Sequence, residues 1–365
     1  MPERRLKIIH SESSCGWGGQ ELRILSESAG MIARGHDVGI VCAVHAPLYA
    51  EAQARNIPVW PLPIERKRIS AVVAFARWLS EHPCDILNTH SSTDSWLAAL
   101  ACRLISRRPA LVRTRHVSVP IRSTFATRWL YRQPRRVVTT GEALRDQIIE
   151  LGIPGNRVRS IPTGQDTQKF SPGFRDAARE QLGIAVDLYV ISIVATLRSW
   201  KGHRYLIDAF ARIAAPNMQL LIVGDGPQRT ALEQRAREHA CSAQIVFVGQ
   251  QPDVAPYLQA SDLFVLPSYA HEGVPQSLIQ AMLCGLPIIT TPVGAIGEAV
   301  TDGVSALMVA PHDVDALADA IRAMIDDPDR AVNLSSHARA RAIDTFSVER
   351  MLEAMEQVFH DAVAG

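Results

Sequence analysis

Residues 263–292, which read LFVLPSYAHEGVPQSLIQAMLCGLPIITTP, decide how the rest of the chain is interpreted. An apolar run ends at Pro267, a polar segment follows, and apolar residues then recur at helical spacing as far as Gly285. Gly285 can adopt the left-handed conformation that ends a helix, and Pro287 prevents its continuation. The stretch therefore predicts strand, loop, helix and strand, with Glu272 in the loop at the carboxyl end of a buried strand.

Such a loop is where open α/β sheets bind ligands, and amides at the following helix N-terminus favour anions. Eight residues separate Glu272 from Gln280, which a continuous helix would convert into about 12 Å along its axis. The two side chains could hold the ends of a long ligand whose charged middle lies on amides near Gly273. A sugar nucleotide has this layout, and an ordinary βα turn with a stray glutamate is the alternative.

The stretch resembles the signature of glycosyltransferase family 4, in which Glu-Gly-Phe-Pro precedes a helix that carries a second glutamate. This chain has Glu-Gly-Val-Pro at 272–275 and Gln280 in place of the second glutamate. The resemblance implies an α/β GT-B architecture of two facing Rossmann-like domains, with the active site in the interdomain cleft. It also implies a metal-independent, retaining transferase of hexosyl type that uses a nucleoside diphosphate sugar and no cofactor.

A second motif follows an apolar run at 188–197, where Arg198 and Lys201 stand three apart before a helical pattern. Two cations in such a loop are well arranged to hold a diphosphate as it accumulates charge. They resemble the family's Arg…Lys-Gly pair, which implies that they stabilise the leaving phosphate. The resemblance further implies that Glu272 orients the sugar, Gln280 meets the ribose and His116 completes the sugar pocket. His90, which follows the preceding predicted strand, is a weaker candidate for the same cleft. It assigns donor contacts to Gly18, Gly19, Gly249, Gln250, Gly273, Val274, Pro275, Gln276, Gln280 and Gly294.

Length and composition fit two globular domains, since 365 residues exceed one ordinary core and 47% are hydrophobic. Strand patterns at 6–10, 38–42, 59–62, 86–89, 110–114, 137–140 and 158–161 predict a first parallel sheet; those at 188–197, 219–223, 245–248, 263–266, 288–291 and 306–309 predict a second. We expect an acceptor-side domain over 1–165, a nucleotide-sugar domain over 166–346, and a helix over about 347–365 that crosses back to the first. No signal-peptide core or membrane span is recognisable, so a cytoplasmic protein with reduced, scattered cysteines is expected.

The charge is asymmetric: residues 1–165 carry 23 basic and 13 acidic side chains, and the remainder 15 and 24. Ten arginines and no acidic residue lie between Arg103 and Arg136, interleaved with Phe125, Trp129 and Tyr131. This composition suits anionic lipid headgroups and predicts peripheral attachment to the inner face of the cell membrane. The acceptor would then be a lipid-linked, lipopolysaccharide or other cell-surface glycan. Nucleic acid is the competing partner, but no nucleic-acid motif supports it.

Two Asp-x-Asp triplets, at 313–315 and 327–329, could suggest a metal, but both lie at helix boundaries where aspartate caps amides. We therefore predict no metal site. Two further functions remain open: a sugar-nucleotide epimerase of the same architecture, and a non-catalytic nucleotide-sugar-binding scaffold, for which the replacement at Gln280 leaves room. The sequence does not discriminate UDP, GDP and ADP donors, nor does it name the sugar, the acceptor or the oligomeric state.

Overall fold

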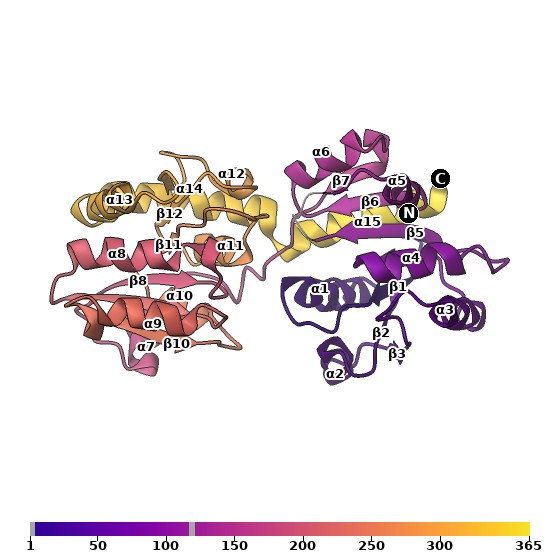
Figure 1. Cartoon of the computed structure of the whole chain (residues 1–365), viewed down its shortest axis with the longest axis horizontal. Coiled ribbons are helices and arrows are strands. Elements are labelled where there is room, and N and C mark those ends of the chain that lie inside the picture. Colours follow the sequence, from indigo (N-terminus) through magenta and orange to yellow (C-terminus); the bar gives the residue numbers. More distant parts are fainter. Residues whose placement is uncertain (1–3, 117–120) are drawn as a thin grey trace. The chain divides into compact units, whose positions relative to one another are not determined.

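A computed structural model describes residues 4–116 and 121–365. The chain divides into two compact units, one formed by residues 1–164 and 348–365 and the other by residues 165–347. Each unit contains one parallel sheet with helices packed against it (Figure 1). The predicted α/β class is confirmed. The domain boundaries predicted from the sequence lie after residue 165 and after residue 346.

The first unit has a seven-stranded sheet of order β3-β2-β1-β4-β5-β6-β7. All its neighbouring strands pair in parallel, so the carboxyl ends of the strands lie along one edge. The strand order reverses between β1 and β4, which makes that position the switch point of the sheet. The strands are β1 Lys7–Glu12, β2 Asp37–Cys42, β3 Val59–Pro61, β4 Ile86–Thr89, β5 Ala110–Arg115, β6 Arg136–Thr139 and β7 Val158–Ser160.

Helix α15, Val348–Ala364, completes the core of the first unit although it comes last in the chain. Met355 and Phe359 are fully buried with Ile8 and Val112 of the sheet. Burying a side chain of this size contributes about 1.5–3 kcal/mol. The other helices of the unit are α1 Gly19–Ala33, α2 Pro47–Ala54, α3 Ile69–Glu81, α4 Ser92–Ala101, α5 Phe125–Arg132 and α6 Glu142–Glu150.

The second unit has a six-stranded sheet of order β10-β9-β8-β11-β12-β13, again parallel throughout. Its switch point lies between β8 and β11. The strands are β8 Tyr189–Val194, β9 Met218–Val223, β10 Ile245–Gly249, β11 Leu263–Leu266, β12 Ile288–Thr290 and β13 Leu307–Met308. The helices are α7 Arg175–Leu182, α8 His203–Ile213, α9 Arg229–Arg237, α10 Ala255–Gln259, α11 Gln276–Leu283, α12 Ile296–Ala299, α13 Val314–Asp326 and α14 Pro328–Phe346.

The largest difference from the predicted strands is at the end of β8. The apolar run continues to Leu197, but the strand ends at Val194. Leu197 is fully buried, and its amide donates to the carbonyl of Asp225 at 3.0 Å, in a turn rather than in the ladder. The apolar pattern therefore reported burial correctly and strand length incorrectly.

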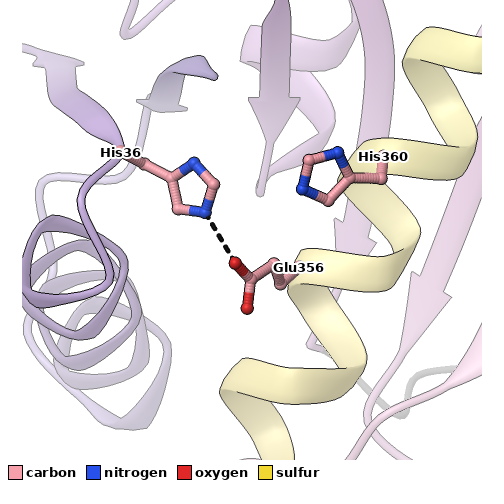
Figure 2. A group of neighbouring side chains, drawn as sticks. All are labelled: His36, Glu356 and His360. Carbon is pink, nitrogen blue, oxygen red and sulfur yellow. Dashed lines mark hydrogen bonds and ion pairs between the residues drawn. The ribbon is translucent and has the colours of Figure 1, made fainter. Parts of the chain in front are cut away.

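A hydrogen-bonded group attaches α15 to the segment between α1 and β2. His36 and Glu356 are 2.9 Å apart between Nε2 and Oε1, and Arg34 donates to the other carboxylate oxygen at 2.7 Å. Figure 2 shows His36 approaching Glu356 and His360, which project from α15. Burial alone would raise the pKa of Glu356, but the hydrogen bonds from His36 and Arg34 outweigh it and lower the pKa. Ionisation of Glu356 therefore stabilises the first unit.

We expect Glu356→Gln to lower the free energy of unfolding at pH 7 by about 1–3 kcal/mol, because charge-assisted hydrogen bonds are lost. A carboxylate whose folded pKa is depressed stabilises above its unfolded pKa, about 4.3, and ceases to do so as the pH falls through the folded value. The difference between the two proteins should therefore be full above about pH 5 and shrink below about pH 4. Urea unfolding at several pH values measures it.

The matched control is Glu353→Gln on the same helix, where the carboxylate pairs with Arg350 and both side chains are more than half exposed. That change should stay within about 0.5 kcal/mol of the wild type. Equal effects of the two substitutions would contradict the role given to Glu356.

Candidate functional site

The second unit gathers charged groups at its switch point. Arg198 and Lys201 follow β8, and Glu272 follows β11, the neighbouring strand on the other side of the reversal. Connections there diverge to opposite faces of the sheet, which leaves a crevice beyond the carboxyl ends.

Glu272 is held by three polar contacts. Lys201 places its Nζ 2.7 Å from Oε1 and 2.9 Å from Oε2, and Ser268 donates its hydroxyl to Oε1 at 2.5 Å. Glu272 is 7% exposed, so the ammonium group compensates a carboxylate that has lost most of its water. The two charges thus fix each other's positions at the sheet edge.

Backbone contacts hold the two loops together. The amide of Tyr269 donates to the carbonyl of Trp200 at 2.8 Å. Gly202 has φ +77°, and a Cβ atom there would lie 1.9 Å from the carbonyl oxygen of Pro267. Glycine is therefore required beside Lys201 both for its conformation and for the close approach of the other loop.

Gly294, a predicted donor contact, lies against the backbone of Glu272. It has φ +61°, and a Cβ atom there would lie 2.1 Å from the carbonyl oxygen of Glu272. The amide of Ala295 donates to that same oxygen at 3.1 Å. The loop after β12 thereby positions the backbone that carries the carboxylate.

Arg198 is exposed and its guanidinium lies 5.6 Å from the ring centroid of Trp200. Among the residues that the structure describes, no carboxylate pairs with it. The turn at 224–227 supports its loop, since Leu197 hydrogen-bonds through its amide to Asp225 and through its carbonyl to the amide of Gln228. Arg198 is therefore a supported cation with room for an anionic ligand.

Helix α11 begins beside Glu272. Pro275 precedes it in an extended conformation and supplies no side-chain cap to its first turn. Gly273 and Val274 lie in the loop, and Gln276 is the first helical residue. Because the helix begins only at Gln276, the separation of about 12 Å expected between Glu272 and Gln280 from a continuous helix is not justified.

Gln280 belongs to a row of amide side chains. Its Nε2 donates to Oε1 of Gln165 at 2.8 Å, and Gln165 donates in turn to Oε1 of Gln276 at 3.4 Å. Gln165 is buried, and its backbone amide donates to the carbonyl of Phe346. The neutral residue at position 280 thus has a neutral partner, which the sequence motif did not indicate.

Gly249 and Gln250 lie at the end of β10, two strands from β8. Gly249 has φ +82°, and its carbonyl accepts from the amide of Gly224 at 2.9 Å. Gln250 is exposed. These two residues share the sheet edge with Arg198 but are separated from it by β9.

The remaining predicted residues belong to the first unit. Gly18 caps α1 with an extended φ of −177°, and Gly19 opens the helix. A Cβ atom at Gly18 would meet nothing nearer than 3.8 Å, so the backbone itself does not require glycine there. His116 follows β5, and its Nε2 lies 2.9 Å from Nδ1 of His90. His90 is 3% exposed, which makes it a buried link rather than an open ligand-binding side chain.

Glu12, a buried carboxylate at the end of β1, was not predicted as a site residue from the sequence. It accepts from the amide of Ser14 at 2.6 Å and from the hydroxyl of Ser91 at 2.5 Å. Burial raises the pKa of Glu12, and the nearby carboxylate of Asp94 raises it further. A charged residue two positions after the predicted strand at 6–10 was the available signal.

His36, Glu356 and His360 are close enough to hold a metal ion (Figure 2). The amide of Leu6 donates to Nδ1 of His36 at 3.2 Å, so the neutral ring carries its proton on Nε2, the atom facing Glu356. If a metal ion bound Nε2, the proton of the neutral ring would move to Nδ1. Nδ1 would then carry a hydrogen that points at the amide N–H of Leu6, which is a donor and not an acceptor. The group is therefore better suited to its hydrogen bonds than to a cation.

The capping interpretation of the Asp-x-Asp triplets is confirmed. Asp313 accepts from the amide of Ala316 at the start of α13, and Asp327 accepts from the amide of Arg330 at the start of α14.

Two family models match the chain, one in each half. The model described as Glycosyltransferase Family 4 matches residues 17–169, and the model described as Glycosyl transferases group 1 matches residues 174–341. The second range contains Arg198, Lys201, Glu272 and Gln280.

Among similar proteins, D-inositol 3-phosphate glycosyltransferase of Mycolicibacterium paratuberculosis is 30% identical over 67% of this chain and 56% of its own length. The chain thus spans little more than half of that relative. UDP-Gal:alpha-D-GlcNAc-diphosphoundecaprenol alpha-1,3-galactosyltransferase of Escherichia coli is 24% identical over 98% of both chains.

The fold matches the crystal structure of Anabaena Alr3699/HepE in complex with UDP, with a TM-score of 0.86 and 22% identity over 98% of this chain and 100% of that one. The same protein in complex with UDP-glucose gives a TM-score of 0.83, with 23% identity over 98% and 100% of the two chains. This likeness confirms the predicted GT-B fold. With one glycosyltransferase model on each half, the chain belongs to the family 4, group 1 glycosyltransferases.

Proposed function

We propose that the protein is a retaining glycosyltransferase that moves a hexose from a nucleoside diphosphate sugar to an acceptor hydroxyl. The observation that carries this proposal is the Lys201–Glu272 ion pair at the switch point of the second sheet, with Arg198 in the same loop as Lys201. The likeness to a protein solved with UDP and with UDP-glucose supports a nucleotide-sugar donor.

In this proposal the donor diphosphate lies against Arg198, Lys201 and the uncapped first turn of α11. Negative charge grows on the leaving phosphate as the glycosidic bond breaks, and preorganised cations and amides stabilise it. Arg198 supplies the positive charge that no described carboxylate compensates, and Lys201, which contacts both oxygens of Glu272, has one further N–H donor for the phosphate. The proposal therefore includes no metal and no cofactor.

Glu272 then orients the sugar, while Gln280 meets the ribose. Glu272 is already fixed by Lys201 and Ser268, so little ordering entropy is lost on binding. The Gln280 carbonyl can accept a hydroxyl hydrogen bond while its amide group stays bonded to Gln165.

Retention of configuration enters this proposal from the family resemblance, and the partners of Glu272 argue against hydrolysis by a double-displacement glycosidase. Its polar contacts are a lysine and a serine, rather than the second carboxylate, about 5 Å away, of a double-displacement glycosidase. We propose that the leaving phosphate takes the acceptor proton on the face from which it departs.

The acceptor is proposed to be a lipid-linked or other cell-surface glycan, with the first unit attached to an anionic membrane. The name of the Escherichia coli relative, which specifies a diphosphoundecaprenol-linked sugar as its acceptor, supports this. In the described part of the chain no helix is both long and apolar enough to cross a membrane.

The structure corrects which side chains of the arginine-rich segment could take part. Arg113 is 3% exposed and stacks over Tyr131, itself 1% exposed, with the guanidinium carbon 4.3 Å from the ring centroid. Trp129 is half-buried and stacked on Trp96. Phe125, at 87% exposure, is the aromatic residue of the segment that remains open to a membrane, next to exposed Arg122, Arg128 and Arg132.

Replacing either Arg198 or Lys201 by alanine should raise the barrier by about 2–4 kcal/mol, which lowers kcat by roughly 30- to 1000-fold. Nucleoside diphosphate release from UDP-, GDP- and ADP-sugars, with and without a glycan acceptor, measures turnover. Arg204→Ala, an exposed arginine in the next helix, is the matched control and should be neutral. Normal turnover in both site variants would refute the proposal. Formation of an epimerised donor sugar in the absence of acceptor would favour an epimerase. Binding of the nucleotide sugar without any turnover would favour a non-catalytic scaffold.

Gly294→Ala should lower the free energy of unfolding by about 1–3 kcal/mol and weaken UDP-glucose binding, because the new methyl group displaces the Glu272 backbone. Gly297→Ala, nearby in α12, is the control, since its Cβ atom would meet nothing within 4 Å. Thermal shift with UDP-glucose measures both quantities; a ligand at a hundred times its Kd adds about 2.7 kcal/mol. Identical behaviour of the two variants would contradict the contact.

For the membrane, we expect the protein to co-sediment with anionic liposomes at low salt and to be released as salt is added. Arg128→Gln with Arg132→Gln should weaken binding at least about tenfold, since each basic residue contributes about 1 kcal/mol. Phe125→Ser should weaken it further. The charge-matched control is Arg237→Gln with Arg330→Gln on the second unit. If the wild-type protein stays in the supernatant, the membrane part of the proposal is wrong, and the basic surface would instead bind a soluble anionic acceptor.

A further inference from the structure

Three histidines from separate parts of the first sheet form a continuous chain of ring contacts. Nδ1 of His10, in β1, lies 2.9 Å from Nε2 of His90, and Nδ1 of His90 lies 2.9 Å from Nε2 of His116. The rings stack at 5.2 Å in each pair. The chain leads from the fully buried His10 to the half-buried His116 at the carboxyl edge of the sheet.

All three rings are neutral. Burial lowers the pKa of His10 to about 3 and takes those of His90 and His116 well below the ordinary value, with the charge of Arg23 adding to each shift. A neutral imidazole has one N–H donor and one bare acceptor nitrogen. Each contact needs one of each, so the three protons have two concerted arrangements: every Nε2 protonated, or every Nδ1 protonated.

The inner end of the chain selects between these arrangements. Oε1 of Glu27 lies 4.0 Å from Nε2 of His10, and its other oxygen lies 3.5 Å from Nε of Arg23, which is also buried. Burial raises the pKa of Glu27, and the charge of Arg23 opposes that rise. Because a guanidinium stays protonated in proteins, its buried charge requires Glu27 to be the carboxylate. A carboxylate favours a proton on the nitrogen that faces it, so His10 carries its proton on Nε2.

We propose that Glu27, His10 and His90 are positioning residues that fix the tautomer of His116. With Nε2 protonated in all three rings, His116 presents a bare Nδ1, and among the described residues no group is bonded to that atom. His116 is then a hydrogen-bond acceptor for a hydroxyl group and not a donor. That this hydroxyl belongs to a sugar rests on the proposed function; the tautomer does not.

Nitrogen-15 NMR of protein labelled at histidine tests the tautomer directly, because the two nitrogens of a neutral ring have well separated shifts. His10→Asn and His116→Asn assign the signals. His203 is an internal reference, since it is buried in the second unit and no described residue hydrogen-bonds its ring. We expect protonated Nε2 and bare Nδ1 in all three rings of the chain. A proton on Nδ1 of His116 in the wild-type protein would overturn the proposal.

Glu27→Gln provides the second measurement. Arg23 retains its need for an acceptor, so the amide oxygen should face Arg23 and the amide N–H group should point toward Nε2 of His10, where a bare nitrogen is then favoured. All three tautomers should then reverse together, while His203 stays unchanged. Unchanged tautomers in this variant would remove Glu27 from the proposal. If the Glu27→Gln variant does not fold, His90→Phe replaces it. That substitution breaks the chain of rings, so His116 should show a mixture of both tautomers. A single His116 tautomer identical to that of the wild type would mean that the chain does not fix it.

Kinetics separate this inference from the proposed function. In Glu27→Gln, with the His116 tautomer reversed, KM for the substrate whose hydroxyl meets His116 should rise more than kcat falls. Reversed tautomers in a protein that transfers no sugar from any donor would sink the proposed function and leave the positioning role intact. Normal KM and kcat with reversed tautomers would show that His116 meets no substrate hydroxyl.

Discussion

The ion pair between Lys201 and Glu272 is the contact on which the arrangement of the second unit's site depends. A carboxylate this deeply buried is stable only with a compensating charge, and the lysine comes from the loop of the neighbouring strand. That proximity brings the two loops into near backbone contact, and Gly202 lies where a Cβ atom would collide with the carbonyl of Pro267. Gly294, in the loop after β12, comes equally close to the carbonyl of Glu272. The loop that carries Glu272 is thus held in close backbone contact on two sides, each time at a glycine.

Much of this unit could be predicted because its signals are local. In a parallel sheet every strand ends at the same edge, so a residue that follows an apolar run is placed near residues that follow other runs. Glu272 and Lys201 were predicted in this way and Gly294 by the family resemblance, and the structure brings Lys201 and Gly294 each against Glu272. The row of amides at Gln280 was not predicted, since Gln165 joins it from the start of the unit through a contact that no sequence spacing indicates.

The first unit was less predictable because its important contacts are long-range. His10, in β1, and Glu27, in α1, occupy apolar patterns in which one polar residue carries little weight, and their role appears only when His90 and His116 are placed beside them. In the arginine-rich segment, composition did not show which side chains are exposed. Composition treats all its arginines alike, whereas Arg113 turns inward on Tyr131 while Arg128 stays in solvent.

The position of α15 has a consequence for synthesis on the ribosome. The sheet of the first unit is translated first, yet the part of its apolar surface that α15 covers stays exposed until Val348–Ala364 has emerged, after the whole of residues 165–347. The second unit is therefore the first to have all its residues available for folding. Meanwhile the apolar surface around Ile8 and Val112 is exposed in the nascent chain, where chaperones bind such surfaces. Truncation before Val348 would leave that surface open permanently.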